Sequence, residues 1–188
     1  AVPIFVSRGC EVHEIAVGKS VFQLVVGDIT RQDTEAVVNA ANAQLAPGGG
    51  VAGAIHRAAG PKLWEECATL GGCKTGEAKL SKGYNLPNAS VIHTVGPVYG
   101  GRKEDPELLR SCYLKSLELA ERHGIRSVAF PALSTGIFGY PVGEAAKVAI
   151  DAIVGYLKGS TAIELVRMVL YDQAAYQVHS DYLNTVRV

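Results

Sequence analysis

The chain has 188 residues, and its 18 Lys and Arg side chains balance 18 Asp and Glu side chains, so its formal net charge is zero. A neutral chain is not expected to hold nucleic acid mainly by charge. Hydrophobic residues make up 48% of the sequence, which is enough to build the core of one domain. No apolar run approaches the ~20 residues of a membrane span, and the N-terminus lacks the pattern of a signal peptide.

The four cysteines, Cys10, Cys67, Cys73 and Cys112, are scattered along the chain without a CxxC pair. This spacing favours reduced, mostly buried thiols over a disulfide framework or a structural metal site. Reduced thiols are typical of the cytoplasm, which is therefore the compartment we expect.

Short β-rich runs alternate with helix-forming segments along the chain. Strands are expected at residues 21–26, 36–38, 90–95, 127–131 and 165–171. The runs at 90–95 and 127–131 have the continuous apolar character of strands that are buried on both faces.

Helices are expected at 51–59, from Asp105 to Gly124, from Pro141 onward and at 172–184. Asp105 is the expected N-cap of the second helix and Pro106 its first helical position. The pair Gly60-Pro61 is interpreted as the stop signal of the first helix. This alternation predicts a three-layer α/β/α sandwich around a mixed, mainly parallel sheet, in which ligands bind at the carboxyl ends of the strands.

The first of three loops at predicted strand ends is the segment Gly27-Asp28-Ile29-Thr30. The Asp28 carboxylate can accept a hydrogen bond from an exocyclic amine such as that of adenine. It can equally cap a turn or a helix, and the sequence alone favours that second role.

The second loop lies between two asparagines, Asn39 and Asn42, and the helix predicted at 51–59. It contains three consecutive glycines, Gly48 to Gly50, which let a backbone turn tightly and come close to a ligand. A strand, a glycine loop and a helix N-terminus together present free N–H groups to a phosphate.

The third loop, residues 134–140, has two hydroxyl side chains and two glycines around the apolar pair Ile137-Phe138. This composition suits a second phosphate cradle with an aromatic lid, and two cradles indicate a diphosphate. No loop has the GxGxxG or GxxxxGK[ST] pattern, which argues against a Rossmann dinucleotide site or a P-loop.

Five segments of the chain, in this order and spacing, resemble a macro domain: GDIT, VVNAAN, GGGVAGAIHRAAGP, VIHTVGP and SVAFPALSTGIFGYP. The HRAAGP, CKTG and STGxxGYP pieces are most similar to the MacroD-type branch, whose members remove single ADP-ribose units from proteins. The resemblance implies that residues 1–188 form a single macro domain, with residues 1–20 as an N-terminal extension or edge element.

The resemblance also implies a site for ADP-ribose. Asp28 matches the acid that binds the adenine amine, beside the backbone of Ile29, and Tyr171 matches a residue that often stacks on adenine. Asn42 matches the asparagine that holds the distal ribose, and it is the candidate catalytic residue. The two implied diphosphate loops consist of Gly49, Gly50 and Val51, and of Ser134, Thr135, Gly136, Ile137, Phe138 and Gly139, with Phe138 near the distal ribose.

Ala52 departs from the MacroD-type pattern. Those hydrolases typically read GGGVDG, with an aspartate proposed to activate water or orient the ribose, whereas this chain reads GGGVAG. A methyl group does neither. Other macro domains with alanine at this position, including coronaviral ones, are regarded as hydrolases in which the substrate's phosphate and the asparagine position the water.

The resemblance therefore implies binding of ADP-ribose and hydrolysis of mono-ADP-ribosylated protein or of O-acetyl-ADP-ribose, without a metal or redox cofactor. Ala52 favours the alternative, a reader of ADP-ribose marks without turnover. A domain that binds RNA or poly(ADP-ribose) is disfavoured by the neutral charge. The expected partners are ADP-ribose or a mono-ADP-ribosylated protein, and not a membrane or nucleic acid.

Four further residues receive structural interpretations. His56 lies one helical turn beyond Ala52 and could serve as a substitute base, but a histidine on a packed helix is more often structural. His93, inside an apolar strand, is expected to be a hydrogen-bonded core residue. Trp64 and Tyr113 are expected to be core aromatics.

Overall fold

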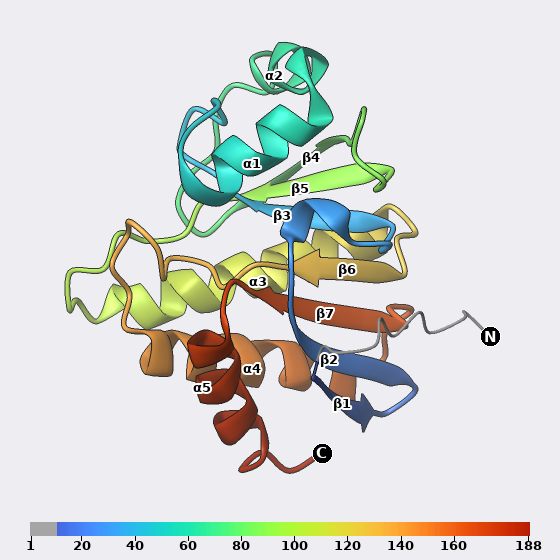
Figure 1. Ribbon diagram of the computed structural model, residues 1–188, viewed down its shortest axis with the longest axis vertical. Helices are drawn as coiled ribbons and strands as arrows, with labels where there is room; N and C mark the ends of the chain where they lie inside the picture. Colours follow the sequence, from blue (N-terminus) through green and yellow to red (C-terminus); the bar gives the residue numbers. More distant parts are fainter. Residues whose placement is uncertain (1–10) are drawn as a thin grey trace.

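The computed structural model describes residues 11–188, which form one seven-stranded sheet in the order β1-β2-β7-β6-β3-β5-β4 with helices packed against it (Figure 1). The strands are β1 (Val12–Val17), β2 (Ser20–Val26), β3 (Ala36–Ala40), β4 (Ala78–Lys82), β5 (Ser90–Thr94), β6 (Ser127–Phe130) and β7 (Leu165–Leu170). The five strands predicted from the sequence are confirmed.

The inner strands β2, β7, β6, β3 and β5 pair in parallel. The two edge strands, β1 and β4, pair antiparallel to β2 and β5. The predicted mixed, mainly parallel sheet is therefore confirmed, and part of the segment 1–20 is its edge strand β1.

The helices are α1 (Gly50–Ala59), α2 (Pro61–Cys67), α3 (Glu104–Arg122), α4 (Val142–Lys158) and α5 (Gln173–Leu183), with a short 3-10 helix η1 (Ile29–Arg31) after β2. Alternate residues of the strands pack into two separate cores. Ala36 and Val38 of β3 join the core under α3, α4 and α5, whereas Val37 joins the core under α1 and α2. This period of two places helices on both faces, as the three-layer sandwich requires.

Two helix boundaries differ from the prediction. Helix α3 begins at Glu104, so Asp105 lies inside its first turn and is not the N-cap. The Asp105 carboxylate instead accepts hydrogen bonds from the backbone N–H groups of Gly100 and Arg102, at 2.9 and 3.1 Å. Gly60 does end α1, with a φ of 87°, but Pro61 then begins α2 directly. Proline is well suited to this first helical position because its missing N–H would be unpaired there anyway.

The prediction that Trp64 is a core residue is wrong. Trp64 is 38% exposed, because α2 turns Leu63 and Cys67 to the core and leaves Trp64 on its outer side. Tyr113 is 1% exposed on α3, as predicted.

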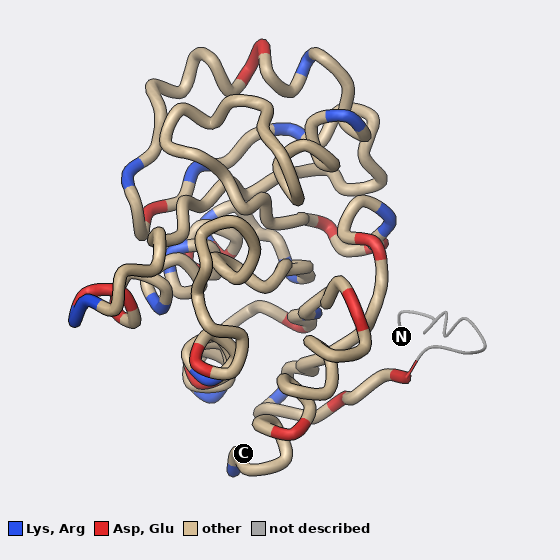
Figure 2. The backbone as a smooth tube through the Cα atoms, turned by 60° about the vertical axis from the view of Figure 1, so that its left-hand side comes forward, with Lys and Arg blue, Asp and Glu red and all other residues tan. Residues whose placement is uncertain are grey.

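Cys67, Cys73 and Cys112 are buried, which agrees with the prediction of mostly buried thiols, and Cys10 lies outside the described residues. Burial raises the pKa of Cys67 and of Cys112 to about 11, so both stay protonated at neutral pH. Within residues 11–188, no helix is both long and apolar enough to cross a membrane. Basic and acidic positions are intermixed along the chain (Figure 2).

Candidate functional site

A cleft of about 870 Å³ opens at the carboxyl ends of three parallel strands. Its walls include Gly27, directly after β2, Pro131, directly after β6, and Tyr171, directly after β7. One face of α1 and one face of α5 close the sides. The cleft therefore lies where ligands bind in sheets of this kind.

The structure brings many of the predicted site residues together around this cleft. Those that line it are Asp28, Ile29, Gly50, Val51, Thr135, Gly136 and Tyr171. Those that do not line it are Asn42, Gly49, Ser134, Ile137, Phe138 and Gly139. Tyr171, with 93% of its surface exposed, stands at the mouth of the cleft, and Ile137 is 99% exposed on the second glycine loop.

Asp28 both caps η1 and lines the cleft. Its Oδ1 accepts hydrogen bonds from the N–H of Thr30 at 2.9 Å and from the hydroxyl of Thr30 at 2.7 Å. These hydrogen bonds hold the pKa of the Asp28 carboxyl below its ordinary value. The other oxygen, Oδ2, faces only the exposed Arg31 side chain at 3.7 Å and remains available to a ligand. The two roles that the sequence left open are therefore compatible.

Asn42 braces the turn that leads into the first glycine loop. Its Nδ2 donates to the carbonyl oxygen of Ala46, and its Oδ1 accepts from the N–H of Ala46, both at 2.9 Å. Leu45, inside this turn, has a φ of 59°, which the bracing helps to maintain. A side-chain amide has two N–H donors and two acceptor lone pairs, so Asn42 keeps one of each for a further partner.

The first glycine loop leads directly into α1, and no side chain caps the N-terminus of this helix. Gly49 is the N-cap of α1, and the first turn contains no acidic residue. The first N–H groups of the helix are therefore free to bind an anion. Inside the helix, a Cβ at Gly53 would collide with the carbonyl oxygen of Gly48, so the loop packs directly on the helix backbone.

The second glycine loop is closed by its own backbone. The N–H of Tyr140 donates to the carbonyl of Ser134 at 2.9 Å, and that of Gly139 donates to Gly136 at 3.0 Å. Ser134 has a φ of 66°, which is unusual for a residue with a side chain. Its buried hydroxyl has no hydrogen-bond partner among the described residues. Strained backbone and unpaired buried polar groups concentrate at functional segments, so this loop is a candidate part of the site.

The two histidines are buried outside the cleft lining. His93 lies 3.0 Å from Asn39 Nδ2 through Nδ1 and 2.8 Å from Ser81 Oγ through Nε2, which confirms its prediction as a hydrogen-bonded core residue. Burial lowers the pKa of His93 to about 3. His56 is 7% exposed, and desolvation lowers its pKa. His56 is therefore a buried residue outside the cleft lining, as its structural interpretation expects.

Arg57, on α1, lines the cleft and was missed by the sequence analysis. The signal was present, because Gly50, Ala54 and Arg57 follow the spacing of one helix face. Since Gly50 was assigned to the ligand, the residues four and seven positions further along faced the same space.

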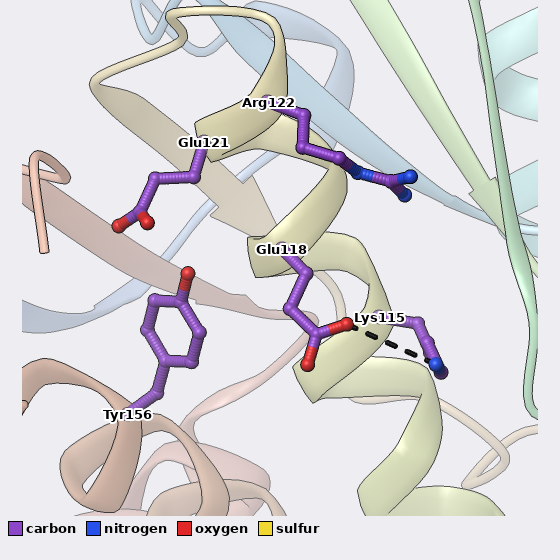
Figure 3. Close-up of a pocket in the computed structure, with 5 residues that line it drawn as sticks. All are labelled: Lys115, Glu118, Glu121, Arg122 and Tyr156. Atoms are coloured by element: carbon purple, nitrogen blue, oxygen red, sulfur yellow. Dashed lines mark ion pairs between the residues drawn. The ribbon is translucent and has the colours of Figure 1, made fainter.

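A second, more open depression of about 500 Å³ lies between α3 and α4 (Figure 3). Its lining residues are Lys115, Glu118, Glu121, Arg122 and Tyr156. Lys115 and Glu118 already pair at 3.9 Å, and none of the three strand-end loops contributes to this depression. We therefore place the functional site in the larger cleft. Among residues 11–188, no three His, Cys, Asp or Glu side chains are grouped so as to hold a metal ion.

Comparison with known proteins agrees with this architecture. The macro domain family model matches residues 38–149. A macro domain-containing protein of Chlorobaculum tepidum is 57% identical over 143 residues, which cover 76% of this chain and 83% of the relative. The ADP-ribose glycohydrolase MACROD1 of Bos taurus is 54% identical over 134 residues, which cover 70% of this chain but 41% of that longer protein.

Among solved structures, the Oceanobacillus iheyensis macrodomain with ADP superposes with a TM-score of 0.91 at 37% identity and covers 93% of this chain and 96% of that one. The sheet order, the two glycine loops at strand ends and these matches agree with one another. The chain belongs to the macro domain family.

Proposed function

We propose that the cleft binds ADP-ribose and that the domain hydrolyses ADP-ribose from mono-ADP-ribosylated protein side chains or from O-acetyl-ADP-ribose. The observation that carries this proposal is the convergence of Asp28, the first glycine loop and the second glycine loop on one cleft. The relative named as an ADP-ribose glycohydrolase and the structural neighbour solved with ADP support it.

In the bound state that we propose, Asp28 Oδ2 accepts a hydrogen bond from the adenine amine, beside the backbone of Ile29. Tyr171, at the mouth, stacks on the base. Residues 49–51 and 134–139 hold the diphosphate through backbone N–H groups, which requires the close approach that glycine permits.

Asn42 is the proposed contact to the distal ribose. Its free N–H and its free lone pair can serve a ribose hydroxyl without loss of the two hydrogen bonds to Ala46. The turn would then fix the direction of the amide before the ligand arrives, which lowers the entropic cost of holding the ribose in a reactive pose.

The proposed reaction is an attack of water on the anomeric carbon, which breaks the bond to the protein side chain and releases that side chain with a proton. On O-acetyl-ADP-ribose the water attacks the ester carbonyl, which releases acetate and ADP-ribose. Ala52 is 6% exposed and offers no group that can take a proton. The water is therefore oriented by the substrate's own phosphate and by Asn42, and the protein contributes positioning and electrostatic stabilisation.

A reader of ADP-ribose marks is the second candidate function, and Ala52 is the observation that favours it. A reader needs the same cleft and loops but no positioned water. Binding data alone cannot separate the two functions, so turnover has to be measured.

Calorimetry with ADP-ribose and AMP tests the binding half of the proposal. We expect micromolar or tighter binding of ADP-ribose and much weaker binding of AMP, because AMP lacks the second phosphate and the distal ribose. Equal affinities would contradict the proposed use of both loops. Displacement of bound ADP-ribose by poly(A) at equal nucleotide concentration would instead support an RNA-binding site.

Release of ADP-ribose from an auto-modified ADP-ribosyltransferase tests the catalytic half. The hydrolase predicts time-dependent loss of the modification at high enzyme concentration, with free ADP-ribose as the product. Tight binding without any release would leave the reader as the function of the domain.

A further inference from the structure

Arg57 is a cationic side chain in the wall of the cleft that none of the roles above uses. It lies on the face of α1 that also carries Gly50 and Ala54, and all three line the cleft. Because α1 begins at the first glycine loop, this face leads from that loop into the second turn of the helix.

The Arg57 guanidinium lies back over the first turn of α1. Its Nη1 is 3.0 Å from the position that a Cβ would occupy at Gly53. The absence of a side chain at Gly53 leaves the room for this conformation. Since the same Cβ position also touches the Gly48 carbonyl oxygen, the guanidinium is placed beside the first glycine loop.

The Arg57 side chain is exposed and has no ion-pair partner within residues 11–188, where the acids near the cleft are engaged elsewhere. Asp28 faces Arg31 and caps η1. Asp172 caps α5 by accepting a hydrogen bond from the N–H of Ala175 at 2.8 Å. Arg57 is therefore a free cation, with its hydrogen-bond donors available.

The charges of the cleft lining give such a cation a role when the ligand is an anion. Of the described residues that line the cleft, Asp28 and Asp172 carry negative charge, and Arg57 is the one that carries positive charge. A diphosphate diester would add a dianion to two carboxylates. Without Arg57, only the backbone N–H groups of the two glycine loops and of the α1 N-terminus would oppose this repulsion, and none of them carries a full charge.

We propose that Arg57 compensates the charge of the ligand's diphosphate, so that the cleft selects ligands with two linked phosphates over uncharged nucleosides. The inference rests on the proposed binding of ADP-ribose and adds a residue that discriminates by charge. A guanidinium on a flexible stem beside the glycine loop can reach a phosphate oxygen with paired donors once the ligand is seated.

The test compares Arg57→Gln, Arg57→Lys and the control Arg110→Gln, which changes an exposed arginine of α3 that does not line the cleft. Each variant is titrated with ADP-ribose at low and at high salt by calorimetry, and with adenosine by NMR chemical shifts, which report weak binding. Thermal melts establish that each variant is folded.

We expect Arg57→Gln to weaken ADP-ribose binding by ~10-fold at low salt, the equivalent of one charge-assisted hydrogen bond. Its adenosine affinity should stay within about twofold of wild type, and its salt dependence should be smaller because one cation is lost. Arg57→Lys should keep the salt dependence, and Arg110→Gln should match wild type.

An Arg57→Gln variant with wild-type affinity and salt dependence for ADP-ribose would overturn the inference. An equal loss for adenosine and ADP-ribose would also overturn it, because Arg57 would then serve the base or the nucleoside. Failure of the proposed function gives a different result, since the wild-type protein itself would then not bind ADP-ribose.

Discussion

The backbone N–H of Tyr99 donates a 2.9 Å hydrogen bond to the carbonyl oxygen of Phe138 and so ties the loop before α3 to the second glycine loop. The Tyr99 ring also packs against Tyr140, with ring centroids 4.9 Å apart. The loop before α3 is held in turn by the buried Asp105, through the N–H groups of Gly100 and Arg102. Asp105 thus positions the second glycine loop without contact to the cleft.

Replacement of Asp105 is expected to weaken ligand binding from a distance. Asp105→Ala leaves the N–H groups of Gly100 and Arg102 without their acceptor, so residues 98–102 lose their fixed position and Phe138 loses its brace. We expect a several-fold rise in the dissociation constant for ADP-ribose and a lower melting temperature. Glu104→Gln, on the exposed side of the same turn, is the control. Unchanged affinity in a folded Asp105→Ala protein would separate this loop from the site.

Two glycines in helices are expected to respond oppositely to alanine. At Gly53 the new Cβ would collide with the Gly48 carbonyl and displace the Arg57 guanidinium, so Gly53→Ala should cost ~1–3 kcal/mol of stability and weaken binding. At Gly155, inside α4, nothing lies within 4 Å of the Cβ position. Gly155→Ala should therefore stabilise the fold by ~0.5–1 kcal/mol. Urea unfolding checks both, and equal effects would contradict the packing of the loop on α1.

Stability is expected to fall as the solution becomes acidic. The pKa of His93 is about 3 in the folded protein and 6.5 when the side chain is not buried. Between pH 3 and pH 6.5 the unfolded chain therefore binds a proton that the folded chain excludes. The free energy of unfolding should then drop by up to about 1.4 kcal/mol per pH unit below pH 6.5. His56 and His179, whose pKa values burial also lowers, act in the same direction.

Urea unfolding at pH 7 and pH 5 measures this slope. The variant His93→Gln should show a smaller slope between the two values, even if it is less stable at both. A slope identical to that of wild type would mean that other groups cause the acid sensitivity.

Two substitutions of Asp28 are expected to separate its proposed contact to the ligand from its role as the cap of η1. Asp28→Asn keeps an oxygen for the N–H of Thr30 but loses the anionic acceptor that faces the cleft. It should weaken ADP-ribose binding by roughly 1–3 kcal/mol with little change in stability. Asp28→Ala loses the cap as well and should also be less stable. Full affinity in Asp28→Asn would return Asp28 to a capping role alone.

The parts of the fold that were predicted from the sequence are those that a continuous apolar run determines, such as β5 and β6. The edge strand β4 was not predicted because Lys79 and Lys82 interrupt its hydrophobic pattern and most of its residues are half-exposed. Helix α2 was not predicted because its seven residues contain too few turns to reveal a helical period of hydrophobic residues. In addition, Pro61 can either end or begin a helix.

Asp105 shows a different limit of sequence reasoning. An acid before proline suits an N-cap, but the same pair fits two positions later, inside the first turn, when a preceding loop offers N–H groups to the carboxylate. At the site, glycine loops and Asp28 could be found by composition. The direction of the Arg57 side chain could not, because it depends on the space left at Gly53 by the tertiary packing of α1.

Gly139, in the second glycine loop, gives a further test of the proposed diphosphate contact, because nothing lies within 4 Å of its Cβ position in the protein itself. Gly139 has a φ of 73°, which strains any other residue, and its loop is proposed to wrap the diphosphate. Gly139→Glu should abolish ADP-ribose binding, because it adds a side chain and a negative charge there. Gly101, which has a φ of 69° and an equally open Cβ position but belongs to neither glycine loop, supplies the control Gly101→Glu. Near-normal affinity in a folded Gly139→Glu protein would place the ligand elsewhere.

Catalysis is expected to depend on Asn42 more than binding does. Asn42→Ala removes the amide that is proposed to hold the distal ribose in its reactive pose, so turnover should fall by a larger factor than affinity. It also removes the brace to Ala46, so Asn42→Asp, which keeps an acceptor for the Ala46 N–H, serves as the matched variant. Calorimetry and release of ADP-ribose from modified protein are measured on the same samples.

Ala52→Asp is expected to raise turnover, since it places a carboxylate one residue after Val51, beside the proposed distal ribose. A general base typically contributes ~100-fold or more, but the gain should be smaller here because position 52 is buried and shaped for a methyl group. Activity in Ala52→Asp without activity in wild type would make the natural domain a reader. Activity in both, together with loss in Asn42→Ala, would support hydrolysis assisted by the substrate's phosphate. Binding without activity in either protein would exclude the proposed hydrolysis, because neither the natural alanine nor a restored carboxylate would then activate water in this cleft.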